Sequence, residues 1–95
     1  MTYLEEIRHA IKQLHGCESR HVVTTPVKEL FKGQVAWEGE VETFDLVGHP
    51  KAKKAYAWGY PNGRGGLEVV AVLEIPPVES PQTAVKAAIV AQAKK

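Results

Sequence analysis

The sequence predicts an α+β domain in which a helix, an antiparallel meander of three or four strands and a second helix form a two-layer sandwich. Residues 2–15 and 81–94 carry helix patterns with clear start signals. Residues 34–77 alternate between apolar and polar positions around two turns, GHPKAKK and GYPNGRGG. The 95 residues suffice for a single domain, 1–95, near the lower end of the length that builds a core unaided.

The overall composition excludes several classes of protein. A net charge of +1 gives no general attraction to nucleic acid or to an anionic membrane, so either would need a local basic patch. No apolar run approaches the length of a membrane span, and the N-terminus lacks the apolar core of a secretory signal. A single cysteine, Cys17, rules out an internal disulfide. We therefore expect a cytoplasmic protein with no membrane partner.

The first helix, residues 2–15, has signals at both ends. Thr2 and Glu5 have the spacing of a capping box, and Gly16 supplies a residue that accepts the left-handed conformation after the last turn. An apolar stripe with helical spacing lies between them, at Leu4, Ile7, Ile11 and Leu14. The pattern predicts a helix that packs one face on the rest of the domain.

Residues 20–31, RHVVTTPVKELF, are rich in β-branched side chains but contain Pro26. Proline has no N–H to donate, so we expect an edge strand that is broken or bent at Pro26. The alternative is that Pro26 begins a short helical turn, PVKELF.

The strand that begins at Val35 changes phase. Its apolar residues occupy odd positions up to Val41 and even positions at Phe44 and Leu46. If all of them face one core, the strand needs an extra residue near Glu42 or Thr43, such as a β-bulge, or a strong coil.

The next strand, residues 53–60, has an alanine face and an aromatic face, and the last strand, residues 67–75, alternates in the same way. The helix after Ser80-Pro81 is rich in alanine and ends near Lys94 and Lys95. Small residues on helix and strand allow close packing, so we expect both helices on the alanine face. The aromatic face would then be open, as a homodimer interface or a ligand or nucleic-acid platform. The alternative is that the aromatic face is itself the core and the alanine face points outward.

This aromatic face and the basic turn beside it give the predicted interface or binding residues. Tyr and Trp suit a dimer interface, while a basic loop beside them would suit single-stranded nucleic acid. The set is Trp37, Lys51, Lys53, Lys54, Tyr56, Trp58, Tyr60, Arg64, Val70 and Val72.

Catalytic and metal-binding patterns are sparse. His15, Cys17 and His21 lack the spacing of a zinc site, and Cys17 follows a helix C-terminus, where the dipole opposes a thiolate. His49 lies in a Gly-His-Pro turn near Glu40 and Glu42, and a histidine beside carboxylates can act as a general base. We expect no cofactor or metal, and keep a small-molecule or enzyme site around His49 as an alternative.

Two resemblances accompany these patterns. The order of elements and the Gly48-His49-Pro50-Lys51 loop resemble the double-stranded-RNA-binding domain, although the second helix lacks the lysine cluster of that family. Residues 25–91, with FKGQVAWEGEVETFDLVGHPKAKKAYAW and VAVLEIPPVESPQTAVKAAIV, are similar to small bacterial proteins of the mobile-element and integron gene-cassette type. That resemblance implies no activity, cofactor or catalytic residue.

The sequence thus predicts a non-enzymatic binding or interaction domain that self-associates through its aromatic face as a homodimer. The first alternative is an RNA-binding module that uses the basic loop 51–54 and the aromatic strand 56–60. The second is the site at His49.

Overall fold

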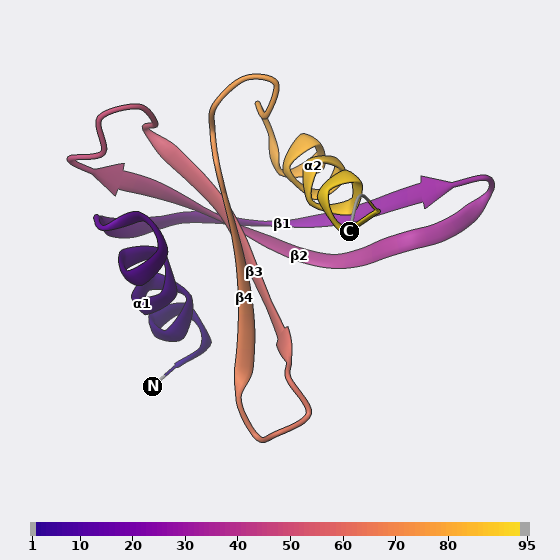
Figure 1. Ribbon diagram of the computed structural model, residues 1–95, viewed down its shortest axis with the longest axis horizontal. Coiled ribbons are helices and arrows are strands. Elements are labelled where there is room, and N and C mark those ends of the chain that lie inside the picture. Colours follow the sequence, from indigo (N-terminus) through magenta and orange to yellow (C-terminus); the bar gives the residue numbers. More distant parts are fainter. Residues whose placement is uncertain (1, 94–95) are drawn as a thin grey trace.

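A computed structural model describes residues 2–93 and confirms the predicted fold class, a helix, an antiparallel sheet and a helix (Figure 1). The four strands follow one another across the sheet in chain order, and each pairs antiparallel with the next. The elements are α1 (Tyr3–His15), β1 (Glu18–Phe31), β2 (Gln34–Val47), β3 (Lys54–Pro61), β4 (Leu67–Leu73) and α2 (Pro81–Ala93). The predicted extension of α2 to Lys94 and Lys95 lies outside the described residues.

Helix α1 begins and ends as its sequence predicts. The Thr2 hydroxyl accepts a hydrogen bond from the Glu5 backbone, and the Glu5 carboxylate accepts one in return from the Thr2 backbone. The Glu5 carboxylate also accepts a hydrogen bond from the Thr2 hydroxyl, and this bond, together with the one from the Thr2 backbone, holds the pKa of the Glu5 carboxyl below its usual value. At the other end Gly16 adopts a left-handed conformation with φ of 71° and donates to the carbonyl oxygen of Lys12.

Strands β1 and β2 form a long ribbon that reaches well beyond the rest of the sheet (Figure 1). β1 is an edge strand, as predicted, and it runs through Pro26 without a break, which excludes the helical turn. β2 pairs with β3 only over residues 42–45, where the two ribbons cross. The outer half of the ribbon therefore projects from the sheet and ends in a turn at Lys32 and Gly33.

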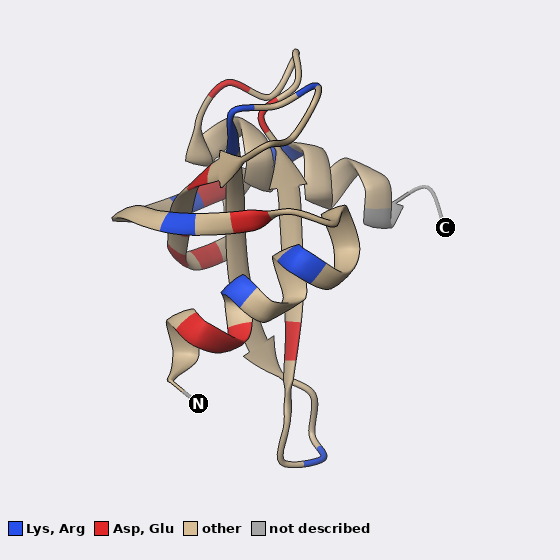
Figure 2. Cartoon of the chain, turned by 90° about the vertical axis from the view of Figure 1, so that its left-hand side faces the viewer, with Lys and Arg blue, Asp and Glu red and all other residues tan. Residues whose placement is uncertain are grey.

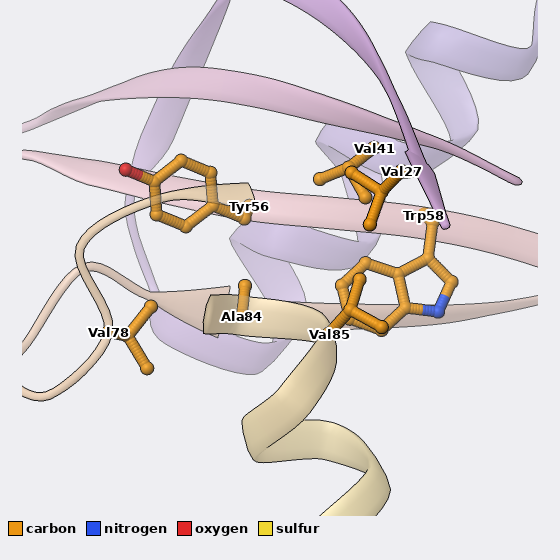
Figure 3. Packing of buried hydrophobic residues seen from close by; sticks show 7 residues of the cluster. All are labelled: Val27, Val41, Tyr56, Trp58, Val78, Ala84 and Val85. Atoms are coloured by element: carbon orange, nitrogen blue, oxygen red, sulfur yellow. The ribbon is translucent and has the colours of Figure 1, made fainter. Parts of the chain in front are cut away.

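The two helices cover opposite faces of the sheet, so the expectation that both lie on the alanine face is wrong for α2. On one face Ile7 and Ile11 of α1 pack against Phe44 and Ala57. On the other face α2 covers the aromatic side of β3 (Figure 3). Its cluster consists of Val27, Val41, Tyr56, Trp58, Val78, Ala84 and Val85.

This arrangement explains the phase change in β2 without an extra residue near Glu42 or Thr43. Val41 faces the α2 core and Phe44 faces the α1 core, so a regular stretch of strand between them supplies both. The pairing of β2 with β3 is uninterrupted from Glu42 to Asp45. The predicted irregularity is instead on the neighbouring strand, where Val22 of β1 is the unpaired residue opposite Thr43 and Phe44.

Tyr56 joins the α2 core to the segment that leads into α2. Its ring is buried, and its hydroxyl donates to the Glu74 carboxylate at 2.5 Å and contacts the Glu79 carbonyl oxygen at 3.2 Å. Burial, and next the hydrogen bond and charge of Glu74, raise the pKa of the Tyr56 hydroxyl far above its ordinary value. The neutral phenol is therefore the form that the fold stabilises.

We expect Tyr56→Phe to destabilise the protein by about 1 kcal/mol at neutral pH, because it removes this hydrogen bond. Above about pH 10 an unfolded tyrosine ionises while folded Tyr56 stays neutral, so its contribution to stability falls as the pH rises. In urea unfolding, the difference in free energy of unfolding between wild type and Tyr56→Phe should be smaller at pH 10.5 than at pH 7. An unchanged gap would contradict the environment described for Tyr56.

Candidate functional site

Helix α2 is apolar on nearly all sides. From Ala84 to Ala91 its only polar residue is Lys86. A helix of that composition is normally buried all round, yet the sheet covers only one side of α2. Val90 is 51% exposed on the outer side, and apolar grooves lie on both flanks of the helix.

The first flank of α2 faces the projecting end of the β1–β2 ribbon. There the tip of the ribbon and α2 enclose a groove of about 480 Å³, which we call the hairpin groove. Its lining is Glu29, Leu30, Phe31, Ala36, Lys86, Ile89 and Val90. Leu30 is 56% and Phe31 66% exposed, so the largest apolar side chains of the tip are open to solvent.

The charges around the hairpin groove are mainly positive. Its one acid, Glu29, accepts a hydrogen bond from Gln82 and lies 3.9 Å from the Lys86 ammonium group. Lys86 remains 57% exposed, and the Lys32 ammonium group lies 5.5 Å from the centre of the Phe31 ring. The acid is thus already paired, and two cations flank the apolar surface.

The second flank of α2 faces β4, the edge strand of the sheet. A groove of about 480 Å³ runs between them, which we call the edge groove. Its lining is His15, Val70, Ala71, Val72, Leu73, Ala87, Ala88 and Ala91. No strand in the described part of the chain pairs with the outer edge of β4. The groove therefore lies beside backbone groups that have no strand to bond.

The predicted aromatic residues fall into three environments. Tyr56 and Trp58 are buried beneath α2, so the core alternative holds for them and they form no open platform. Trp37 is half-buried and meets Trp58 edge to face, with ring centres 5.4 Å apart. Tyr60, near the end of β3, is 47% exposed. Of the same predicted face, Val70 and Val72 line the edge groove, and Tyr60 lines a separate pocket with Arg64.

The predicted cations do not form one cluster (Figure 2), and only Arg64 lines a pocket with an exposed predicted aromatic, Tyr60, in the described part of the chain. Lys54 binds Asp45 across β2 and β3 at 2.6 Å, as the facing acidic and basic segments suggest. Lys51 and Lys53 are exposed in the turn before β3, whereas Arg64 is exposed in the turn after it. The two turns lie at opposite ends of β3, and of the three rings on that strand Tyr56 and Trp58 are buried and Tyr60 is exposed.

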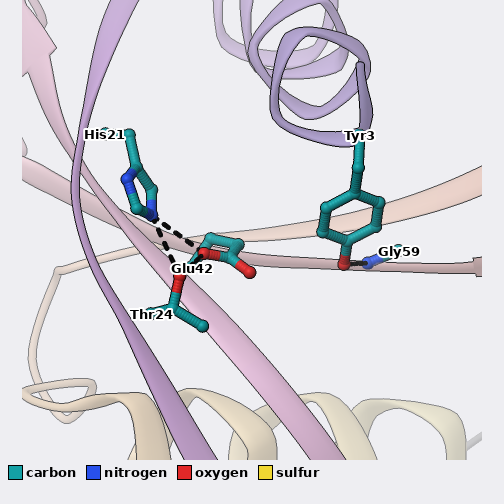
Figure 4. A network of polar contacts seen from close by, with 5 residues as sticks. All are labelled: Tyr3, His21, Thr24, Glu42 and Gly59. Carbon is teal, nitrogen blue, oxygen red and sulfur yellow. Dashed lines mark hydrogen bonds and ion pairs between the residues drawn. The ribbon is translucent and has the colours of Figure 1, made fainter.

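The His49 side chain forms hydrogen bonds within its own turn. Its Nδ1 accepts hydrogen bonds from the backbone N–H groups of Lys51 and Ala52, both at 3.0 Å. Glu42, which we placed near His49, instead accepts a hydrogen bond from His21 at 2.8 Å and another from Thr24 (Figure 4). His49 and Glu42 thus form separate contacts rather than one site.

The hydrogen bonds of Glu42 link β2 to β1 on both sides of the bulge at Val22. The Glu42 side chain is 5% exposed, and its Oε1 accepts the bonds from both His21 and Thr24, which offset the cost of burying the carboxylate. Sequence reasoning missed this pair because the bulge at Val22 decides which β1 side chains reach Glu42. His21 and Thr24 have the three-residue spacing that a one-residue bulge brings to one side.

The candidate metal ligands also separate. His15 lies 3.4 Å from the carbonyl oxygen of Ala71, His21 bonds Glu42, and Cys17 is a buried free thiol. Within residues 2–93 no three His, Cys, Asp or Glu side chains come together as a metal site would require. No helix in that range is long and apolar enough to cross a membrane.

The residues of the hairpin groove were not predicted. Leu30, Phe31 and Val35 were assigned to strands, and strand patterns do not show that a ribbon projects beyond its sheet. A usable signal was present in α2, where a helix with one charge in eight residues needs cover on more than one side.

Comparisons of the chain with protein-family models, with curated proteins and with solved structures gave no match. The similarity to gene-cassette proteins and the looser likeness to the double-stranded-RNA-binding domain therefore stay predictions.

Proposed function

We propose that the protein is a non-enzymatic, cytoplasmic interaction domain that binds other protein chains along α2. The observation that carries this proposal is the composition of α2, an almost wholly apolar helix with only one side covered by its own sheet. Exposed apolar surface of this kind, bordered by polar residues, marks protein interaction sites. The polar clusters at His49 and Glu42 are each occupied with structural bonds.

The hairpin groove fits an amphipathic helix with acidic residues beside its apolar stripe. A groove between a helix and a ribbon accepts the apolar face of a helix, with anchor side chains spaced at i, i+3, i+4 and i+7. Phe31 and Leu30 form one wall and Val90 the other. Lys32 and Lys86 at the groove would meet carboxylates on the flanks of the incoming helix.

We expect a fluorescently labelled helical peptide, with leucines at those spacings and glutamates on the flanks, to bind in a fluorescence anisotropy titration. Phe31→Ser removes a large anchor at a predicted hot spot and should weaken binding about tenfold. Tyr60→Ser is the matched control, because Tyr60 is an exposed aromatic on the other hairpin, and it should leave binding unchanged.

The charge preference is tested separately. A peptide with the same leucines and lysine flanks should bind more weakly than the glutamate peptide, and added salt should reduce the difference. Lys86→Glu should reverse the preference, whereas Lys53→Glu, an exposed lysine far along the sheet, should not. Binding that is insensitive to Phe31→Ser would overturn the proposal. So would binding to phosphatidylserine vesicles without binding to the peptide, since that result would make the tip a membrane contact.

A further inference from the structure

The two edges of the sheet differ in how well they are protected against pairing with another strand. β1 carries a bulge at Val22 and a proline at position 26, and its sequence includes Arg20 and Lys28. Bulges, prolines and charges are the devices by which edge strands avoid other chains. β4, LEVVAVL, has no proline and one charge, Glu68, and its pairing with β3 is regular over all seven residues.

The outward-facing backbone groups of β4 follow from its register. The Glu74 backbone N–H donates to the Lys54 carbonyl oxygen, and the Asn62 backbone N–H donates to that of Gly66. The even-numbered residues of β4 are therefore the ones that bond to β3. Alternate residues of an antiparallel strand bond to alternate sides. The N–H and C=O groups that point away from β3 are those of Leu67, Val69, Ala71 and Leu73, of which the Leu73 carbonyl oxygen already accepts a hydrogen bond from the Ile75 backbone.

Within the described chain, one side chain makes a polar contact with the backbone groups of this outer row. His15 at the end of α1 lies 3.4 Å from the Ala71 carbonyl oxygen, longer than an ordinary hydrogen bond. An incoming backbone N–H would make a shorter bond to the same oxygen. The contact with His15 is therefore replaceable.

We propose that β4 pairs antiparallel with β4 of a second copy across a two-fold axis at Val70, giving one continuous eight-stranded sheet. This register pairs all seven residues of β4, with Val69 opposite Ala71 and Leu67 opposite Leu73 of the partner. Glu68 then faces a valine, Val72 of the partner subunit. A two-fold axis at Ala71 would instead set Glu68 opposite the acid of Glu74 on the partner strand, and like charges directly opposite are unfavourable.

In addition to backbone hydrogen bonds between the strands, the edge groove offers the second copy side-chain contacts. The two-fold axis brings the α2 helices of both copies to the same face of the joined sheet. Their facing sides carry Ala87, Ala88 and Ala91, which allow two helices to approach closely. The pairing thus covers a second flank of α2 and leaves the hairpin groove open. The sequence predicted self-association through the centre of the aromatic face, whereas this proposal places the dimer contact at the β4 edge of that face.

Cysteine cross-linking tests the register directly. In a Cys17→Ala background, Val70→Cys places two thiols on a non-hydrogen-bonded antiparallel pair, whose Cα separation of about 4.5 Å suits a disulfide. We expect a covalent dimer in a glutathione redox buffer. Val72→Cys is the matched control, because the two copies of residue 72 would lie about 13 Å apart along the strands. It should remain a monomer on a non-reducing gel.

Sedimentation equilibrium of the chain without added cysteines provides the second measurement. The wild type should show a dimer. Val69→Pro, which removes an outward-facing N–H, should weaken dimerisation at least tenfold with an unchanged circular dichroism spectrum. A wild type that stays monomeric at high micromolar concentration would overturn the proposal. A Val72→Cys cross-link as efficient as that of Val70→Cys would also overturn it, as would stronger cross-linking by Ala71→Cys.

The dimer and the hairpin groove can fail independently. Phe31→Ser should cross-link through Val70→Cys as efficiently as the parent chain, because Phe31 lies on the other flank of α2. Val69→Pro should bind the acidic peptide as the wild type does. His15→Ala should dimerise at least as well as the wild type, and weaker dimerisation would show that His15 supports the interface instead of covering it.

Discussion

Replacing Trp58 with alanine is expected to lower the free energy of unfolding by about 3–5 kcal/mol, the usual cost of truncating a buried large aromatic side chain. Trp58 is 5% exposed and packs between Val85 of α2 and the ring of Trp37. Because its cover comes from the same chain, the loss should not depend on protein concentration. Urea denaturation at two concentrations a hundredfold apart measures both quantities.

Tyr60→Ala is the control for Trp58→Ala. Tyr60 lies two residues further along the same strand and face, but it is 47% exposed and should cost less than about 1 kcal/mol. If the two substitutions cost the same, α2 does not cover Trp58 as described. A loss from Trp58→Ala that grows on dilution would show that a second copy supplies the cover.

Phe44→Ala is expected to cost about 3–5 kcal/mol as well, through the other core. Phe44 is fully buried, with Ile7 and Ile11 of α1 packed over it. Val47→Ala, three residues further along β2 at a 55% exposed position, should be nearly neutral. Thermal unfolding followed by circular dichroism would test this, and a small loss for Phe44→Ala would mean that α1 is not docked on that face.

The sequence predicted the elements of this fold well, because each one carries local signals. The capping box at Thr2 and Glu5, the stop at Gly16 and the Ser80-Pro81 start all act within a few residues of themselves. The same holds for β1 as an edge strand, since the missing N–H of Pro26 excludes a central position.

The faces of the sheet were harder to predict, because they depend on partners far away in the chain. The pairing of small residues with small residues suggested that α2 covers the alanine side of β3. In the structure Ala84 and Val85 of α2 lie instead against the large rings of Tyr56 and Trp58. Small residues on a helix can pack against small residues or leave room for large ones on the strand. The amino-acid sequence is compatible with both kinds of packing and does not distinguish between them.

The candidate site was the least predictable part. Exposed residues such as Phe31 and Val90 have ordinary strand and helix patterns, and only the projection of the β1–β2 ribbon sets them on one surface. Val70 and Val72 were identified because they flank the aromatic strand, and they lie at the groove for the separate reason that β4 ends the sheet.

Strand β2 also determines which wrong structures the chain avoids. Its apolar residues serve α2 up to Val41 and α1 from Phe44, so a shift of one residue against β3 would turn both groups away from their cores. The same shift would turn Glu42 from His21 and Thr24 into the apolar side beneath α2, with no partner for its charge. One misaligned residue is thus penalised on both faces at once, and this double penalty selects a single alignment during folding.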